Sequence, residues 1–321
     1  MNSYRPDEDL DLVVEKKALI AEGIVSLTLR KAAAHSELPP WSPGAHIELV
    51  LPEGTVRQYS LCGDLDERNT WKIAVLREPK SRGGSAFIHD TLKHGDLIRV
   101  RGPRNNFLLD HDKHSYLFIA GGIGITPLLP MIQAVDALGR DWQLAYGGRS
   151  RTSMAFHDWL SEQYGDNVKL IPQDEEGVLP LEVLLSDPKR AIYCCGPGPL
   201  LDAVAEGCRD RPAGTLRVER FSPKAATRRR GGAGEFELEL AASGVIIFVP
   251  ENKSVLEAMV EAGVAIEYSC TEGICGTCET KVLGGRPEHR DSILTEDEQA
   301  ANNTMFPCVS RSLTERLVID R

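Results

Sequence analysis

Four cysteines near the C-terminal end of the 321 residues constrain the fold more than any other feature. Cys270, Cys275 and Cys278 have the spacing C-x4-C-x2-C, and Cys308 follows 29 intervening residues later. Thiolates at this spacing hold a plant-type [2Fe–2S] cluster, with three ligands from one tight loop and the fourth from a distant segment. The loop CTEGICGTC also contains two glycines, which let peptide N–H groups approach the sulfides. The pattern therefore predicts a domain that carries electrons.

Structural zinc is the main alternative for four such cysteines, because zinc also prefers thiolates. Zinc ribbons usually contain two C-x2-C pairs, whereas here only Cys275 and Cys278 form one. A disulfide framework fits less well still, since the sequence begins with no signal peptide and thiols of cytosolic proteins stay reduced. The spacing favours the iron–sulfur interpretation over both alternatives.

Composition is typical of a soluble globular protein, with 42% hydrophobic and 26% charged residues, and the length predicts two to three domains. The most apolar stretch, residues 116–132, is interrupted by five Gly and Pro residues. It therefore predicts a buried strand, a turn and a helix instead of a membrane span. We expect a cytoplasmic, monomeric protein without membrane association.

The net charge of −10 is concentrated in the cysteine-containing segment. Residues 235–321 contain 7 Lys and Arg against 16 Asp and Glu, whereas the other residues contain 30 against 31. This distribution argues against nucleic-acid binding and predicts docking of a basic protein face near the cluster. The alternative is that the acidic residues only keep a small domain soluble.

Changes in pattern divide the chain into three domains and a linker. Residues 1–110 contain six short β-rich segments (10–19, 24–32, 46–52, 56–62, 71–78 and 97–103), which predict a closed antiparallel barrel. Residues 111–221 alternate strand and helix patterns, which predict a doubly wound parallel sheet. Residues 222–234 have the composition of a flexible linker.

The last domain, residues 235–321, has the order expected of a β-grasp ferredoxin. Two strands (236–250) precede an amphipathic helix (254–263) and the cysteine loop, and a final strand (317–321) closes the chain. The acidic segment LTEDEQ (294–299) predicts a helix start capped by Thr295, not a metal site.

Two segments of the predicted barrel have the composition of a flavin site. Arg57-Gln58-Tyr59-Ser60 ends one strand, and Gly83-Gly84-Ser85 leads into the helical segment AFIHDTL. An Arg together with the free N–H groups at a helix start suits a phosphate, and an aromatic wall with a hydroxyl suits the isoalloxazine ring. A strand ending in Tyr-Ser is usually only a strand, but both segments together predict flavin binding.

Two turns of the predicted parallel sheet have the composition of a nucleotide site. GGIGITP (121–127) follows a strand and opens a helix, although it is not the G-x-G-x-x-G fingerprint. Cys195-Gly196-Pro197 ends another strand, where ligands of open α/β folds bind, so its thiol is a candidate neighbour of a nicotinamide ring. The alternative of a small buried hydrophobe applies more readily to Cys62, Cys194 and Cys208.

The motifs RQYS, GGS, GGIGITP, CCGP and the four cysteines, in this order, resemble the ferredoxin–NADP⁺ reductase superfamily with a fused C-terminal ferredoxin. The chain is most similar to the phthalate dioxygenase reductase family, whose members serve Rieske oxygenases. The resemblance implies flavin contacts from Arg57, Tyr59, Ser60, Gly83, Gly84 and Ser85, backbone contacts from Ala74 and Leu76, a place near N5 for Thr126, and ring stacking by Phe221. It implies nicotinamide nucleotide contacts from Gly121, Gly122, Gly124, Arg149, Cys195, Gly196 and Pro197, and cluster ligation by the four cysteines.

The resemblance favours FMN over FAD because it is to the FMN-using branch and because the chain continues past Phe221 into a linker. It also favours NADH, although Arg149-Ser150-Arg151 has the composition of a 2′-phosphate site, so NADPH stays open.

The resemblance implies that NADH gives a hydride to FMN and that single electrons leave through the [2Fe–2S] cluster to an oxygenase or demethylase of aromatic degradation. This chemistry needs no catalytic acid or base, so no histidine is assigned. Electron delivery to a cytochrome P450, general flavin or ferric reduction, nitric oxide scavenging and redox sensing are the alternatives.

Overall fold

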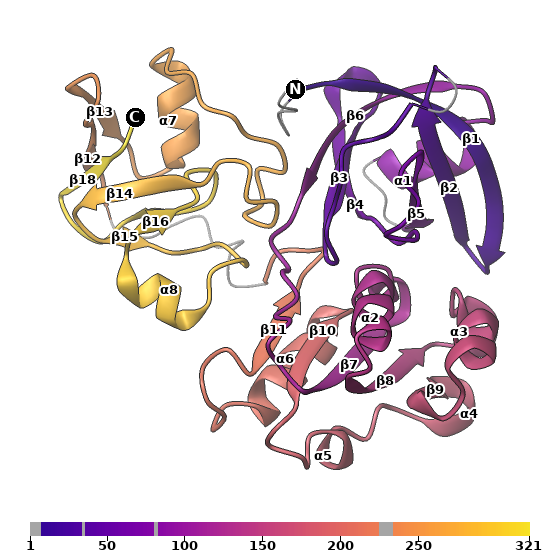
Figure 1. The fold of residues 1–321 in the computed structure, drawn as a ribbon. Helices are drawn as coiled ribbons and strands as arrows, with labels where there is room; N and C mark the ends of the chain where they lie inside the picture. Colours follow the sequence, from indigo (N-terminus) through magenta and orange to yellow (C-terminus); the bar gives the residue numbers. More distant parts are fainter. Residues whose placement is uncertain (1–7, 34–35, 80–82, 225–233) are drawn as a thin grey trace. The chain divides into compact units, whose positions relative to one another are not determined.

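The computed structural model describes residues 8–33, 36–79, 83–224 and 234–321 (Figure 1). These form two compact units, Met1–Glu219 and Arg220–Arg321. Most of the predicted linker, residues 225–233, lies outside the described residues, and the domain boundaries within the first unit stay predictions. No helix in the described ranges is both long and apolar enough to cross a membrane.

The first part of the unit Met1–Glu219 is the predicted antiparallel barrel. Its strands run in the order β4-β3-β6-β1-β2-β5, and the Leu61–Ile73 bridge joins the end of β4 to β5. Alternating apolar residues, including Leu27 and Trp71, fill its interior. The elements are β1 (Leu10–Ala21), β2 (Ile24–Lys31), β3 (His46–Val50), η1 (Pro52–Gly54), β4 (Val56–Ser60), β5 (Thr70–Leu76), α1 (Gly84–Asp90) and β6 (Leu97–Arg104).

The second part is the predicted parallel sheet, with strand order β11-β10-β7-β8-β9. Its strands are β7 (Ser115–Gly121), β8 (Asp141–Gly148), β9 (Val168–Pro172), β10 (Ala191–Cys195) and β11 (Leu216–Glu219), and each neighbouring pair is parallel. The chain reverses its direction of winding between β7 and β10. Ligands of open α/β sheets bind at the carboxyl ends of the strands at such a switch point.

Helices cover both faces of this sheet. Phe118 on β7 faces α2 (Leu128–Ala137) and α3 (His157–Tyr164), whereas Leu117 and Ile119 face α5 (Leu181–Leu184) and α6 (Gly198–Gly207). The glycine turn after β7 first forms a short 3₁₀ helix, η2 (Gly122–Ile125), and α2 follows it from Leu128. The remaining elements are η3 (Arg151–Ser153), η4 (Gly165–Asn167) and α4 (Gln173–Glu176).

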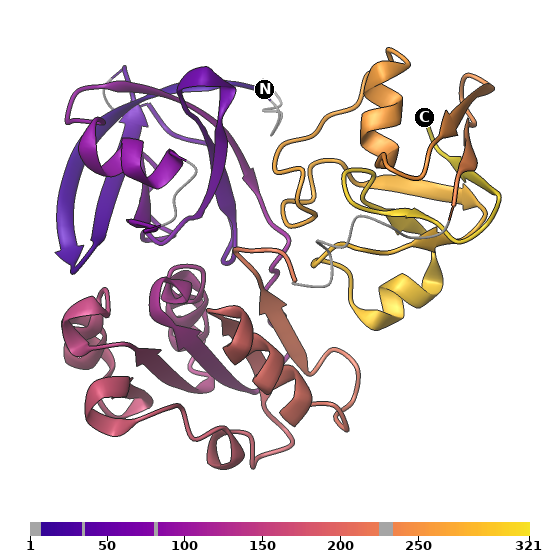
Figure 2. The same cartoon turned by 180° about the vertical axis from the view of Figure 1, so that it is seen from behind.

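The C-terminal unit is a small mixed sheet with the order β13-β12-β18-β14-β16, and α7 (Val255–Glu261) packs against it through Val255, Ala258 and Met259 (Figure 2). The other elements are β12 (Phe236–Leu240), β13 (Val245–Val249), β14 (Thr280–Gly284), β15 (Pro287–Glu288), α8 (Glu296–Ala301), β16 (Thr304–Met305), β17 (Arg311–Ser312) and β18 (Arg316–Ile319). Thr295 caps α8 through a capping box with Glu298, as the sequence predicts.

Candidate functional site

The structure brings the four cysteines together in the C-terminal unit. Cys275, Cys278 and Cys308 are buried, and Cys270 is partly exposed. The Cys270 thiol lies within hydrogen-bonding reach of Cys275 and Cys308, and Cys308 lies within reach of Cys278. Their mutual hydrogen bonds lower the pKa of Cys270 and raise those of Cys275 and Cys308, so the four thiols interact as one group. Thiolates are the form in which cysteines bind iron.

The backbone of the cysteine loop donates to these sulfurs. Glu272 N donates to Cys270 Sγ at 3.3 Å, and Thr277 N donates to Cys275 Sγ at 3.4 Å. Gly273 has a φ of 68°, and a Cβ there would lie 2.6 Å from Val309 Cγ2, so only glycine fits. N–H donors to sulfur stabilise the negative charge of thiolates and cluster sulfides. The loop thus fits a [2Fe–2S] cluster.

An apolar layer surrounds the buried ligands. Leu256 and Phe306 pack with Cys278 and Cys308, and Ile293 and Leu294 lie against this group. Such a layer limits water access and lowers the local dielectric constant around a cluster. Over the ranges that the structure describes, no group of three or more His, Cys, Asp or Glu side chains is arranged as a site for a single metal ion.

The two predicted flavin segments of the barrel meet at the start of α1. A Cβ on Gly84 would lie 2.6 Å from Arg57 Cγ and 2.9 Å from Arg57 Nε, so the Arg57 side chain lies directly over this glycine. Gly83 precedes α1 with a φ of 91°, and Ser85 is buried with Oγ accepting from Glu78 N at 3.2 Å. An arginine and a helix start therefore lie side by side, which suits a phosphate.

The predicted ring-contact residues occupy several positions. Tyr59 lies on β4, and burial raises its pKa well above the ordinary value. Ala74 on β5 is buried in the same apolar cluster as Ile125 of the glycine turn, with Leu76 packed against it, so the barrel and the parallel sheet share a core. Thr126 is buried and donates its hydroxyl to Ile123 O at 3.0 Å. Phe221 is 44% exposed and belongs to the C-terminal unit.

The two glycine-containing turns at the switch point touch each other. A Cβ on Gly124 would lie 2.3 Å from Cys195 O, and a Cβ on Gly196 would lie 2.9 Å from Gly121 Cα. The Cys195 side chain is fully buried, and burial raises its pKa well above the ordinary value. The two turns pack closely against each other at the carboxyl ends of β7 and β10, which is where this fold class binds nucleotides.

Glu219 is a buried acid that the sequence reasoning missed. It ends β11 next to Cys195, and Ser60 Oγ donates to Glu219 Oε2 at 3.4 Å. Desolvation raises the pKa of the Glu219 carboxyl to about 8, and the Ser60 hydrogen bond opposes this shift. The sequence feature that could have indicated Glu219 is its position at the carboxyl end of a predicted parallel strand, two residues before Phe221. At neutral pH the protonated acid holds a proton beside the predicted flavin residue Ser60.

We expect Glu219→Gln to flatten the pH dependence of stability of the N-terminal unit. Between about pH 4.5 and pH 8 the unfolded chain releases the Glu219 proton while the folded chain keeps it. The free energy of unfolding therefore falls as pH rises through this window, by at most about 5 kcal/mol, and levels off above pH 8. The glutamine side chain of the variant carries no charge in either state, so the substitution removes this fall.

Thermal unfolding followed by tryptophan fluorescence measures this effect, since all four tryptophans lie at or before residue 159. Glu162→Gln, an exposed position on α3, is the matched control and should keep the wild-type pH dependence. An unchanged profile in Glu219→Gln would contradict the expected role of burial.

Of the two arginines considered for a 2′-phosphate, Arg151 is engaged by an acidic side chain, and Arg149 is joined to the same acidic helix through its backbone. Arg151 pairs with Glu175 of α4 at 3.0 Å, and Arg149 O accepts from Asp174 N at 3.2 Å. Ser150 forms a capping box with Ser153. The Arg149-Ser150-Arg151 loop therefore faces a short acidic helix, which disfavours a second phosphate.

Comparison with known proteins adds to this geometry. Residues 238–313 match the family model of the 2Fe-2S iron-sulfur cluster binding domain. The phenoxybenzoate dioxygenase subunit beta of Ectopseudomonas oleovorans is 43% identical over 94% of this chain and 93% of that protein. The solved structure of phthalate dioxygenase reductase is 35% identical, with a TM-score of 0.71 over 99% of this chain and 100% of that chain. The chain belongs to the phthalate dioxygenase reductase family.

Membership in the phthalate dioxygenase reductase family confirms the predicted fold class and identifies the chain as an oxidoreductase with a flavin and [2Fe–2S] electron-transfer fold. The chain also matches an intact type IV self-sufficient cytochrome P450 monooxygenase, at 42% identity and a TM-score of 0.90. This match covers 98% of this chain but only 41% of the monooxygenase chain.

Proposed function

We propose that this chain is the reductase component of a Rieske-type oxygenase or demethylase system, which takes hydride from NADH onto FMN and passes single electrons through a [2Fe–2S] cluster to the oxygenase. The four cysteines come together in one group, and this observation carries the proposal. The same chain also has the two glycine-containing turns at the switch point and the contact between Arg57 and Gly84. When bound, the flavin converts a two-electron hydride into single electrons, and the cluster carries one electron at a time.

The chain's own residues bind and orient these groups. Arg57 with Gly83, Gly84 and Ser85 would hold the flavin phosphate, which they fit as an arginine beside a helix start. A larger set would surround the ring: Tyr59, Ser60, Ala74, Leu76, Thr126 and Phe221. Glu219 Oε2 would accept the hydrogen bond from Ser60 Oγ next to the ring edge, while the Glu219 carboxyl stays protonated at neutral pH.

FMN is favoured over FAD by the family likeness and by the continuation of the chain past Phe221. FMN ends at the phosphate that Arg57 and the start of α1 would hold, whereas FAD adds a second phosphate and an adenosine. Acid extraction of the flavin followed by chromatography tests this choice, and recovery of FAD would contradict it.

The acceptor would dock beside Cys270, the ligand among the four that is not fully buried. Tyr268, 46% exposed, and Glu267 lie just before it, and the surrounding segment carries most of the net negative charge. An exposed aromatic residue in an acidic surface suits a protein partner with a basic face. Raising the ionic strength should therefore slow electron delivery to the oxygenase more than flavin reduction.

We expect the chain to prefer NADH because the acidic α4 repels a 2′-phosphate and Glu175 neutralises Arg151. Glu175→Gln frees Arg151 for a 2′-phosphate, so kcat/KM for NADPH should rise about three- to fivefold, because an exposed ion pair contributes up to about 1 kcal/mol. The value of kcat/KM for NADH should stay nearly unchanged. Glu182→Gln, an exposed acid on α5, is the control and should change neither value. A wild-type preference for NADPH would overturn the choice of NADH.

Visible spectroscopy of the purified protein tests the proposed function directly. Flavin and iron–sulfur bands should both bleach on addition of NADH, and added oxygenase should then reoxidise the cluster. A spectrum without flavin would exclude the reductase. Delivery to a cytochrome P450 is the second candidate, because the P450 monooxygenase match extends over 98% of this chain. Faster reoxidation by a P450 haem domain than by a Rieske oxygenase would favour it.

A further inference from the structure

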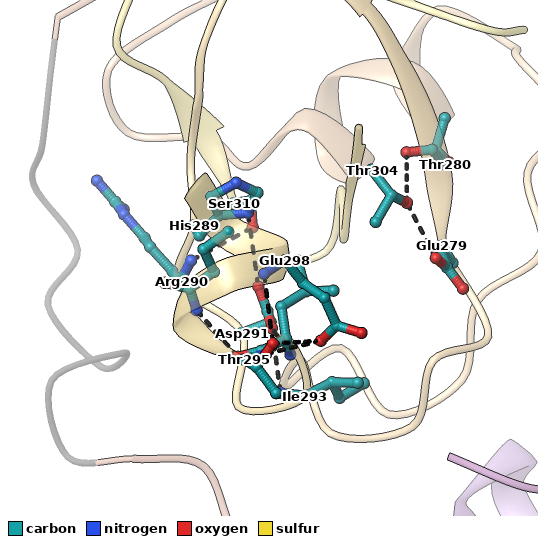
Figure 3. Close-up of polar contacts among 12 residues, drawn as sticks. Glu279, Thr280, His289, Arg290, Asp291, Ile293, Thr295, Glu298, Thr304 and Ser310 are labelled. Atoms are coloured by element: carbon teal, nitrogen blue, oxygen red, sulfur yellow. Dashed lines mark hydrogen bonds and ion pairs between the residues drawn. The ribbon is translucent and has the colours of Figure 1, made fainter. Parts of the chain in front are cut away.

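Two buried titratable side chains, His289 and Asp291, lie in the C-terminal unit outside the predicted ligand set (Figure 3), and Asp291 adjoins the cysteine loop at Gly273. The His289 side chain is 7% exposed and that of Asp291 is 0% exposed. His289 Nδ1 lies 3.9 Å from Asp291 Oδ1. Both residues come from the segment between β15 and α8, so the fold inserts this pair behind the loop that would hold the cluster.

Asp291 holds this segment against the cysteine loop. Its Oδ2 accepts from Ile293 N at 3.0 Å and from Leu294 N at 2.7 Å, which forms a tight turn. The turn lets Ser292 N donate to Gly273 O at 2.9 Å. Gly273 also packs closely against Asp291, since a Cβ added to Gly273 would lie 3.0 Å from Asp291 Cα. One carboxylate thus supports the middle of the loop between Cys270 and Cys275.

The same turn also places apolar cover over the ligands, because Ile293 and Leu294 pack against the group that contains Cys278 and Cys308. Movement of Asp291 would therefore disturb both the loop on one side of the cluster and the apolar layer on the other. A support of this kind orients ligands without touching the metal.

The remaining polar atoms of the pair face each other. Asp291 Oδ1 and both ring nitrogens of His289 have no hydrogen-bond partner within the described ranges. The nearby Arg290 guanidinium pairs with Glu288 at 2.7 Å, and Arg290 N donates to Ser310 Oγ at 3.4 Å. A buried carboxylate requires a compensating polar partner, and the His289 ring is the group that faces its Oδ1.

We propose that Asp291 is a positioning residue of the [2Fe–2S] site and that the His289–Asp291 pair sets the reduction potential of the cluster. Asp291 shapes the cysteine loop and places a buried negative charge beside it, which disfavours the added electron. The His289 ring faces the same carboxylate, with Nδ1 3.9 Å from Oδ1. Charge and hydrogen bonding around a cluster are among the determinants of its potential, and a buried charge acts more strongly than an exposed one. The proposal rests on the cluster domain and not on the identity of the acceptor.

Redox titration of the intact holoprotein, followed by electron paramagnetic resonance of the reduced cluster, tests the proposal. Asp291→Asn keeps the shape and the acceptor oxygen for the turn but removes the charge, so the midpoint potential should shift upward. His289→Gln replaces the ring that faces the Asp291 carboxylate, so the midpoint potential should differ from that of wild type. Asp297→Asn, exposed on α8, removes the same charge in solvent and should leave the potential unchanged, because water and salt screen it.

Iron loss to a chelator tests the positioning role separately. Asp291→Ala loses the acceptor for Ile293 N and Leu294 N and should release iron several-fold faster than wild type, whereas Asp291→Asn should retain it. Equal potentials in wild type, Asp291→Asn and His289→Gln would overturn the proposal while leaving the proposed reductase function intact. Equal iron release from wild type and Asp291→Ala would overturn the positioning part, and if Asp291→Asn assembles no cluster, the potential of His289→Gln decides the electrostatic part.

Discussion

Cys308→Ser is expected to stop electron delivery while leaving the reduction of flavin by NADH intact. Cys308 contacts both Cys270 and Cys278, so it closes the ligand set from a distant segment. Loss of a residue that only supports a metal ligand typically costs 10- to 100-fold, so loss of a ligand should lower the rate with a one-electron acceptor by more than about 100-fold. Stopped-flow flavin bleaching and acceptor reduction, with iron content measured on the same sample, separate the two steps.

Cys208→Ser is the matched control for that experiment. Cys208 is a buried thiol that packs with Leu201 and Val204 of α6 in the N-terminal unit, away from the cysteine loop in sequence and in contacts. The same chemical change there should lower stability slightly and leave acceptor reduction near the wild-type rate. Loss of both flavin bleaching and acceptor reduction in a folded Cys308→Ser protein would contradict the order of electron flow.

Local patterns predicted the elements of the fold well. The six alternating segments of the first 110 residues are the six barrel strands, and the five strand patterns of the next block are β7 to β11. Thr295 and Glu298 are three residues apart, which is enough to predict the capping box. Each of these features depends on neighbours within a few residues, which a sequence displays directly.

Features that depend on distant segments could not be predicted in this way. Ser60 and Glu219 are 159 residues apart in sequence, and neither shows that burial will keep the acid protonated. The sequence around Arg151 looks the same whether its side chain is free to bind a phosphate or is paired with Glu175 of α4. His289 belongs to a charged segment that suggests an exposed surface, yet the fold buries it beside Asp291.

Arg311 is another long-range feature, and it holds the end of the predicted linker against the C-terminal unit. Its guanidinium donates to Gly234 O and Pro250 O, each at 3.1 Å, and to Lys253 O, and it lies 5.2 Å from the centre of the Phe236 ring. Burial lowers the pKa of Arg311, and these carbonyls and the ring face stabilise the charge that remains. Gly234, the last residue of the predicted linker, is thus tied directly to the core of this unit.

Gly124→Ala is expected to remove most NADH-driven flavin reduction, because the two turns at the switch point leave no room for a methyl group. The added Cβ would lie 2.3 Å from Cys195 O and 2.7 Å from Gly196 N, which are backbone atoms that cannot rotate away. The turns must separate, at a cost of about 1–3 kcal/mol in stability. A displacement of the nicotinamide by about 1 Å from the flavin lowers the rate of hydride transfer by on the order of 100-fold.

Gly198→Ala tests whether any new methyl group near this surface has the same effect. Gly198 begins α6, three residues after Cys195, and a Cβ there meets no atom within 4 Å and no positive φ. Alanine should be neutral or slightly stabilising at this position. Stopped-flow reduction over a range of NADH concentrations, with flavin content and thermal unfolding as checks, compares the two variants. The flavin-binding residues of the barrel are unchanged in Gly124→Ala. A wild-type rate of flavin reduction in this variant would therefore show that the nucleotide does not lie over the contact between Gly124 and Cys195.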